Sequence, residues 1–173
     1  DCMSTLTVQN LRGVSPTNTI TVASGHKIYA PGSIMQVVYA RSNARGSTTS
    51  TSPTAIDNAL NLSITPTYST SKIFVAYHVQ ISGGSSAYNI YAYIYRNSTQ
   101  LTYTNCYRVD YSNNTETTRP SLIYLDSPAT TSTLTYALYL SCSSGSYNLQ
   151  YNYASNETGD WGYSYAYAME VAA

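Results

Sequence analysis

The strongest constraint on the fold of this chain is a two-residue alternation of side-chain type. Within residues 88–95, one set of alternate positions carries Tyr88 and then the aliphatic side chains of Ile90, Ala92 and Ile94, and the other carries Asn89 and then Tyr91, Tyr93 and Tyr95. Successive residues of a β-strand point to opposite faces, so this segment is predicted to be a strand with one aliphatic and one aromatic face. We expect the aliphatic face to lie in the core.

The same alternation recurs elsewhere in the chain. In residues 163–171 one face carries tyrosines, Met169 and Val171, while the other carries small side chains and Glu170. Residues 134–142 place leucines on one face. Further strand candidates, separated by stretches rich in Ser, Thr, Asn and Gly, are 34–40, 60–65, 72–81, 100–107, 121–125 and 147–153. With only a single helical turn expected near 57–60, this spacing predicts an all-β fold, an antiparallel β-sandwich of jelly-roll type with eight or nine strands.

The first 31 residues differ from the rest. Their β-like pieces, 5–8 and 19–22, are short and separated by the turn formers Gly13, Pro16 and Asn18. Such pieces are too short to form a core of their own. We therefore predict an N-terminal extended arm or stalk in residues 1–31 and a β-sandwich head domain in residues 32–173, with the boundary at the Pro31-Gly32 turn.

Charge and cysteine content exclude several classes of function. The 173 residues carry a net charge of zero and only 9% are charged, which leaves no electrostatic footprint for nucleic acid. No apolar run is long enough to span a bilayer, so we expect no membrane insertion. Three cysteines, Cys2, Cys106 and Cys142, favour buried thiols over a disulfide framework or a zinc site, with a Cys106–Cys142 pair as the alternative. The opening residue Asp1 indicates a fragment or a processed chain.

The chain has 20 tyrosines but one Phe and one Trp. Tyrosine rows on a strand face either fill a wide core, cover a subunit interface or form a ligand platform. A large aromatic patch is seldom bare on a monomer, whereas a closed homo-oligomer covers it by symmetry. We predict a subunit interface made by Tyr91, Tyr93, Tyr95, Tyr165 and Tyr167.

One loop combines the only tryptophan with acids, an amide and glycines. Aromatic rings pack against sugar rings and polar groups bond their hydroxyls, so this loop is the candidate ligand-binding element, with Asn156, Glu157, Asp160, Trp161 and Tyr163. The alternative is that Trp161 seals the open end of the sandwich. A second polar loop, 110–119, could lie at the distal end.

Neither a metal nor a catalytic role is predicted. His26 and His78 have no second ligand at metal spacing, and no cofactor is expected. Glycan cleavage needs two carboxyl groups at a set separation. The candidates Asp110, Asp126, Glu157, Asp160 and Glu170 are few, and no β-helix repeat accompanies them. No Gly-x-Ser-x-Gly elbow is present. We therefore predict that the chain is not an enzyme.

Several stretches resemble tail-fibre and other virion structural proteins of tailed bacteriophages, especially phages of cyanobacteria and aquatic bacteria. The most specific are residues 4–11 (STLTVQNL) and 18–38 (NTITVASGHKIYAPGSIMQVV). Weaker ones are 62–67 (LSITPT), 71–75 (SKIFV), 125–131 (LDSPATT) and 168–173 (AMEVAA). The Tyr-rich body between them does not share this resemblance.

The resemblance implies a trimeric virion appendage with a globular β head. The expected function is a tail-fibre head domain that attaches to the host surface as a homotrimer, with a capsid decoration or head-fibre protein as the alternative and a depolymerase as a third class. The expected partners are other copies of the chain, other virion proteins through the arm, and a host cell-surface glycan. Trimerisation would multiply weak host contacts by avidity.

Overall fold

A computed structural model describes residue 24 and residues 28–83, 88–109, 116–146, 148–152 and 162–173. The chain divides into two units, residues 1–30 and residues 31–173. The second unit is the β domain described below. The two ends of this unit lie side by side, because Gly32 N donates to Ala172 O and Ala172 N donates to Ser33 O. Most of residues 1–31, the segment predicted to be an arm, lies outside the described residues.

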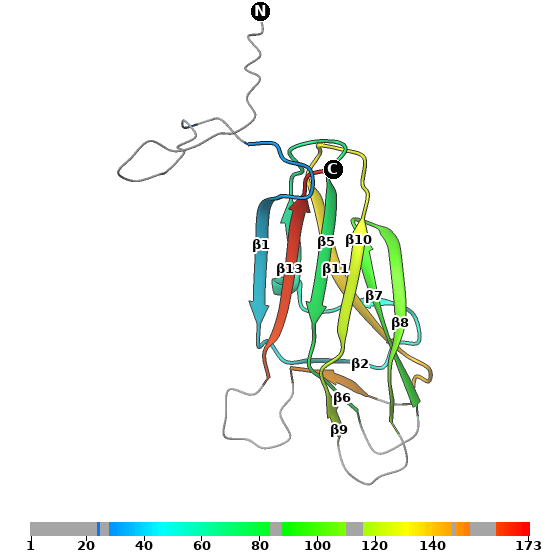
Figure 1. Cartoon of the computed structure of the whole chain (residues 1–173). Helices are drawn as coiled ribbons and strands as arrows, with labels where there is room; N and C mark the ends of the chain where they lie inside the picture. The colour runs from blue at the N-terminus through cyan, green and yellow to red at the C-terminus, as the bar shows by residue number, and fades with distance from the viewer. Residues whose placement is uncertain (1–23, 25–27, 84–87, 110–115, 147, 153–161) are drawn as a thin grey trace, which may run out of the picture. The chain divides into compact units, whose positions relative to one another are not determined.

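Two antiparallel sheets form the sandwich (Figure 1). Sheet 1 has the order β1-β13-β5-β10, and sheet 2 has the order β3-β11-β7-β8, with β4 also paired to β11. The strands of sheet 1 are β1 (Ile34–Ser42), β13 (Ser164–Val171), β5 (Lys72–His78) and β10 (Ser121–Asp126). Those of sheet 2 are β3 (Thr54–Ala55), β4 (Leu62–Ile64), β11 (Leu134–Cys142), β7 (Tyr88–Arg96) and β8 (Thr99–Val109).

The strand order is that of a jelly roll. β3 and β4 flank β11 on the same side, so together they occupy one strand position. The strands of sheets 1 and 2 can then be counted from one to eight in chain order, with β3 and β4 together counted as the second. In this count sheet 1 has the order 1-8-3-6 and sheet 2 has the order 2-7-4-5. This arrangement of two Greek keys in a double sheet defines the jelly roll. The predicted all-β antiparallel sandwich is confirmed.

A third sheet continues sheet 1 beyond a break. Its order is β2-β12-β6-β9. Along the chain β2 follows β1, β12 precedes β13, β6 follows β5 and β9 precedes β10, so the third sheet repeats the order of sheet 1. It lies at the end of the sandwich opposite the C-terminus (Figure 1). The bounds are β2 (Gly46–Thr48), β12 (Leu149–Tyr151), β6 (Ile81–Gly83) and β9 (Glu116–Thr118).

Buried polar groups occupy the break between sheet 1 and the third sheet. Asn152 has a positive φ of 55°, and its backbone N donates to Gln80 O at 3.0 Å. Its side-chain Nδ2 donates to Ala44 O at 2.9 Å, and its Oδ1 accepts from the Ser164 hydroxyl. Gln80 N in turn donates to Ser164 Oγ at 3.0 Å. These bonds satisfy backbone groups that the interrupted ladders would otherwise leave buried without partners.

The core follows the predicted alternation. Ile90, Ala92 and Ile94 of β7 are fully buried, as are Leu138 and Leu140 of β11. In β13 the small side chains Ala166 and Ala168 point inward, so the tyrosines of that strand point outward. The aliphatic faces therefore meet between sheets 1 and 2, as the sequence predicts.

The strand boundaries differ from the predicted ones in two ways: one predicted strand is divided, and three short strands form in polar stretches. Residues 72–81 were expected as one strand but are β5 and the start of β6, because the backbone breaks at Val79 and Gln80. The short strands β2, β3 and β9 lie in Ser- and Thr-rich stretches that the sequence indicated as loops. The predicted single turn is a 3-10 helix, η1 (Asn58–Leu60), whose first turn is capped by the Asp57 carboxylate. No helix in the described ranges is long and apolar enough to cross a membrane.

Candidate binding faces of the sandwich

The outer face of sheet 1 carries two complete rows of apolar side chains. Strand register places one residue from each of the four strands side by side in each row. The first row is Val37, Met169, Phe74 and Leu125, and the second is Tyr39, Tyr167, Ala76 and Ile123. We call these eight residues the apolar face. Neighbouring strands lie about 4.8 Å apart, so each row is continuous across the sheet.

Four of these side chains are more than half exposed to solvent. The exposed fractions are 55% for Val37, 52% for Tyr39, 59% for Ile123 and 51% for Leu125. Tyr39 and Tyr167 pack with ring centroids 5.1 Å apart. Contiguous exposed apolar patches of this kind mark interaction sites in soluble proteins.

Polar and charged side chains border the apolar face. The next row, nearer the third sheet, contains Arg41, Tyr165, His78 and Ser121. The Arg41 guanidinium lies over the Tyr163 ring at 4.2 Å from its centroid, and His78 Nδ1 and Ser121 Oγ are hydrogen-bonded at 2.7 Å. At the other end the row contains Ile34, Val171 and Lys72, so apolar side chains continue on β1 and β13 there and the charge is on β5. His78 is thus part of a polar border, and no group of metal-binding side chains occurs among the described residues.

The outer face of sheet 2 carries a cluster of five tyrosines. Tyr139, Tyr93 and Tyr103 form one cross-strand row, and Tyr91 and Tyr95 flank it on β7. We call these five residues the tyrosine face. Ring centroids are 4.1 Å apart for Tyr95 and Tyr139 and 5.9 Å apart for Tyr93 and Tyr103, and both pairs are stacked.

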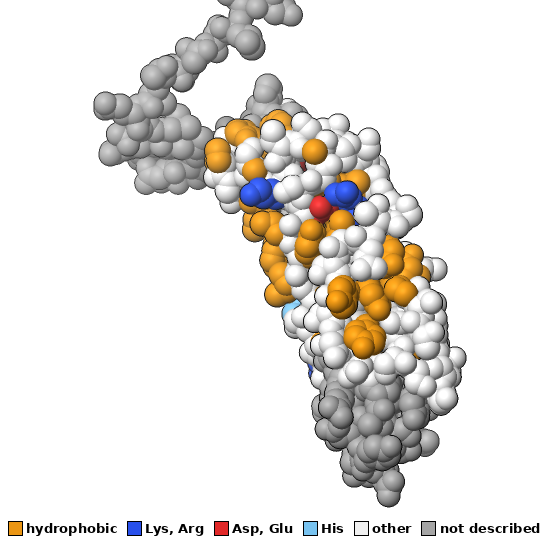
Figure 2. Space-filling view, turned by 90° about the vertical axis from the view of Figure 1, so that its right-hand side faces the viewer, with side chains coloured by type: hydrophobic (Ala, Val, Ile, Leu, Met, Phe, Trp, Pro, Cys, Tyr) orange, Lys and Arg blue, Asp and Glu red, His pale blue; other side chains and the backbone are white. Residues whose placement is uncertain are grey.

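Hydrogen bonds fix two of these rings, and a hollow opens beside them. The Tyr93 hydroxyl bonds the Ser141 hydroxyl at 2.9 Å, and the Tyr95 hydroxyl donates to Gln100 Oε1 at 3.1 Å. An open hollow of about 370 Å³ is lined by Tyr91, Tyr93, Gln100 and Tyr103. Figure 2, which views the molecule from the side of Figure 1 where β8 and β10 lie, shows hydrophobic side chains gathered in separate groups with few charged side chains between them.

The five tyrosines predicted to form a subunit interface do not lie together. Tyr165 and Tyr167 project from sheet 1, whereas Tyr91, Tyr93 and Tyr95 project from sheet 2. The core lies between the two sheets, so these residues occupy opposite faces of the sandwich. Sequence reasoning also missed the aliphatic members of the apolar face, although Ile123 and Leu125 alternate with Leu122 and so make both faces of β10 apolar.

Most of the predicted ligand loop lies outside the described residues. This holds for Asn156, Glu157, Asp160 and Trp161. Tyr163 is described and partly buried, and its ring lies under the Arg41 guanidinium and 6.4 Å from the ring of Tyr165. Of the second polar loop, residues 116–118 are strand β9.

Glu170 is a buried carboxylate held by several donors. It is fully buried on the inward face of β13. Its oxygens accept from Gln36 Nε2 at 2.5 Å, from Thr67 N at 2.6 Å and from Thr67 Oγ1 at 3.1 Å. Burial by itself raises the pKa of the Glu170 carboxyl, but the bonds from Gln36 and Thr67 outweigh burial and hold the pKa below its ordinary value.

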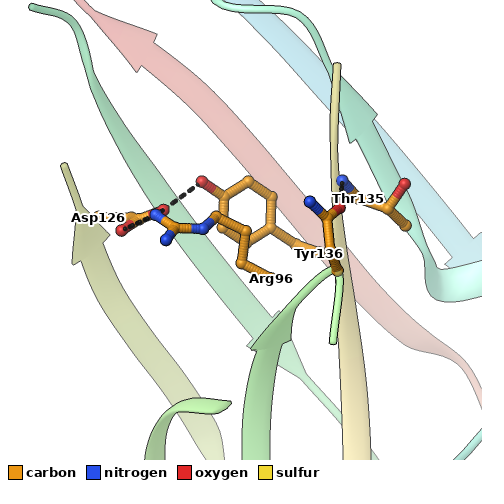
Figure 3. A network of polar contacts seen from close by, with 5 residues as sticks. Arg96, Asp126, Thr135 and Tyr136 are labelled. Atoms are coloured by element: carbon orange, nitrogen blue, oxygen red, sulfur yellow. Dashed lines mark hydrogen bonds and ion pairs between the residues drawn. The ribbon is translucent and has the colours of Figure 1, made fainter. Parts of the chain in front are cut away.

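Asp126 is the second buried carboxylate, and it joins the two sheets (Figure 3). The Arg96 guanidinium on β7 donates Nη1 to both Asp126 oxygens at 2.9 and 2.8 Å. The Tyr136 hydroxyl on β11 donates to Asp126 Oδ2 at 2.6 Å. Burial, together with this bond, raises the pKa of Tyr136 far above its ordinary value.

These contacts assign structural roles to two of the five acids considered for glycan cleavage. Asp126 and Glu170 are both buried and hydrogen-bonded within the fold. Asp110, Glu157 and Asp160 lie outside the described residues. Three stretches that are far apart in the sequence, 18–38, 62–67 and 168–173, meet around Glu170 through Gln36, Thr67 and Glu170 itself.

Cys142 is buried and free, as expected for a small apolar side chain. Burial raises the pKa of its thiol, which keeps the thiol protonated. The predicted alternative, a Cys106–Cys142 disulfide, is therefore not formed in this structure.

Comparison with known proteins does not assign the chain to a family. No family model matches it, and no curated protein matches it.

Proposed function

We propose that this chain is a non-catalytic structural and attachment module of a tailed-phage virion, and that its head assembles as a homotrimer through the apolar face. The observation that carries this proposal is the pair of apolar rows that cross all four strands of sheet 1. The resemblance of the flanking stretches to tail-fibre proteins supplies the setting.

The arrangement of the apolar face favours a protein partner. Its apolar centre is bordered by Arg41 and His78 on one side, and on the other side Lys72 is the charged member of a row that is otherwise apolar. An apolar core with a polar rim is the usual anatomy of a protein interface. A second copy of this chain is the partner because the same face is present on every copy, and cyclic symmetry can bring these faces together. The number three comes from the resemblance.

Light scattering on the purified chain tests the assembly. The wild-type protein is expected to show three chain masses, whereas Ile123→Lys and Leu125→Lys shift it towards one. Both side chains are more than half exposed in the single subunit, so their replacement does not disturb the core. Tyr91→Lys is the matched control and keeps the assembly intact, because Tyr91 projects from the opposite face and lies on β7, an inner strand of sheet 2. A wild-type protein that stays monomeric at every concentration would sink the proposal.

Antibody labelling of virions tests the location. Labelled antibody against the head domain should mark tail fibres in electron micrographs. Label on the capsid surface would instead support the decoration-protein alternative.

A further inference from the structure

The geometry points to the tyrosine face as a binding site for the uncharged sugar rings of a polysaccharide. This inference deepens the attachment role proposed above by naming a ligand class and a site. It uses the outer face of sheet 2, whereas the proposed assembly uses the outer face of sheet 1, and binding and chain mass are measured separately, so that the two failures can be distinguished.

The ring of Tyr103 is presented to solvent on a rigid support. Its exposed fraction is 63%, the largest among the exposed large hydrophobic side chains of the described residues. It stacks on Tyr93, whose hydroxyl is bonded to the buried Ser141. A ring that is fixed before binding loses little conformational entropy when a ligand covers its open side.

The hollow beside Tyr103 combines aromatic and polar groups. Tyr91, Tyr93 and Gln100 complete its lining. Its volume of about 370 Å³ lies within the range of ~300–1,000 Å³ that is usual for small-ligand sites. A pyranose ring has a face of C–H groups that packs on an aromatic ring and a rim of hydroxyls that bond amides and phenols. Tyrosine and glutamine supply both kinds of contact.

The lining of the hollow carries no charge, which selects against anionic ligands there. Its residues are Tyr91, Tyr93, Gln100 and Tyr103, and strand register places the cationic residue of this face, Arg108, opposite Asn89, further along β8. A phosphate or a uronic acid would lose hydration here without gaining a cation. A neutral sugar has no such cost.

The two faces also differ in chemistry. The apolar face combines aliphatic side chains, Met169 and Phe74 with only two tyrosines, which suits a protein contact that excludes water. The tyrosine face has five hydroxyls and a hollow, which suits a hydrated ligand with many hydroxyls.

An array of purified bacterial O-chains and capsular polysaccharides, neutral and acidic, tests the inference on the full chain. We expect binding to neutral polysaccharides. Tyr103→Ala should weaken it by about tenfold, the effect of losing an aromatic contact, whereas Tyr103→Phe should keep it within about threefold because the ring remains. Tyr39→Ala on the apolar face is the matched control and should leave binding per chain unchanged.

Each outcome has a defined meaning. The inference is wrong if no polysaccharide on the array binds, if only acidic ones bind, or if Tyr103→Ala binds as well as the wild type. The inference would also be overturned if the protein bound a peptide through Tyr103 but bound no glycan. Light scattering on the same Tyr103→Ala sample separates this failure from that of the proposed assembly, because that variant is expected to keep the mass of the wild-type protein.

Discussion

The side-chain amide of Gln36 on β1 donates to the carboxylate of Glu170 on β13, 134 residues away in the chain. The same amide also donates to Thr65 O at 2.7 Å. Glu170 accepts from Thr67 on the segment that leads into β5. A single carboxylate thus joins two neighbouring strands of sheet 1 to the loop at one end of the sandwich.

Replacement of Glu170 by Ala should therefore lower the free energy of unfolding by about 2–4 kcal/mol, because several buried donors lose their acceptor. Urea unfolding measures the change. Gln36→Ala is the matched variant and should cost only about 1–2 kcal/mol, since Glu170 keeps its bonds from Thr67. Equal effects of the two variants would show that Glu170 is not the centre of this network.

The contribution of Glu170 to the free energy of unfolding should depend on pH. The pKa of its carboxyl is lower in the folded protein than its ordinary value of 4.5, which stands for the unfolded chain. The contribution is therefore complete above pH 4.5 and is lost as the pH falls through the folded pKa. The difference in unfolding free energy between the wild type and Glu170→Gln, measured from pH 7 downwards, should be constant to about pH 4.5 and then shrink. A difference that grows in acid would contradict the assignment.

Two buried tyrosines should respond in opposite ways to loss of the hydroxyl. Tyr136 donates to Asp126, so Tyr136→Phe should destabilise the protein by about 1–3 kcal/mol. Tyr77 is equally buried, but its hydroxyl has no hydrogen-bond partner among the described residues. Tyr77→Phe should be neutral or stabilising by up to about 1 kcal/mol. Thermal unfolding of the two variants under one condition gives the comparison.

Two glycines form a further matched pair. A Cβ on Gly162 would lie 2.5 Å from the backbone oxygen of Asn152, at the break between sheet 1 and the third sheet. Gly162→Ala should cost about 1–3 kcal/mol, because backbone must move to admit the methyl group. A Cβ on Gly145 meets nothing closer than 3.5 Å, so Gly145→Ala should be neutral or stabilising by about 0.4–1 kcal/mol. Denaturant midpoints of both variants check the contrast.

The sequence predicted the strand core because a two-residue alternation directly determines which side chains point inward. The aliphatic row of β7 and the inward alanines of β13 both follow from it. Strand order does not follow from it, because pairing partners such as Ile34 and Val171 are distant in the chain. The predicted tyrosine interface was divided between two sheets for this reason.

Polar positions were harder to predict. Nothing in the local sequence distinguishes Asp126 and Glu170, which are buried, from acids in loops. Burial of a carboxylate depends on donors supplied by other strands, such as Arg96 and Gln36. The apolar face was missed because exposed apolar residues resemble core residues in sequence.

The position of β13 between β1 and β5 also bears on the order in which the domain can be built. β1 lies at the edge of sheet 1 and has β13 as its neighbour there. Protein synthesis proceeds from the N-terminus, so β1 and β5 emerge from the ribosome long before the strand that links them. Sheet 1 can close only after nearly the whole domain has been released, and a nascent chain stalled before residue 164 would expose β1 without its neighbour.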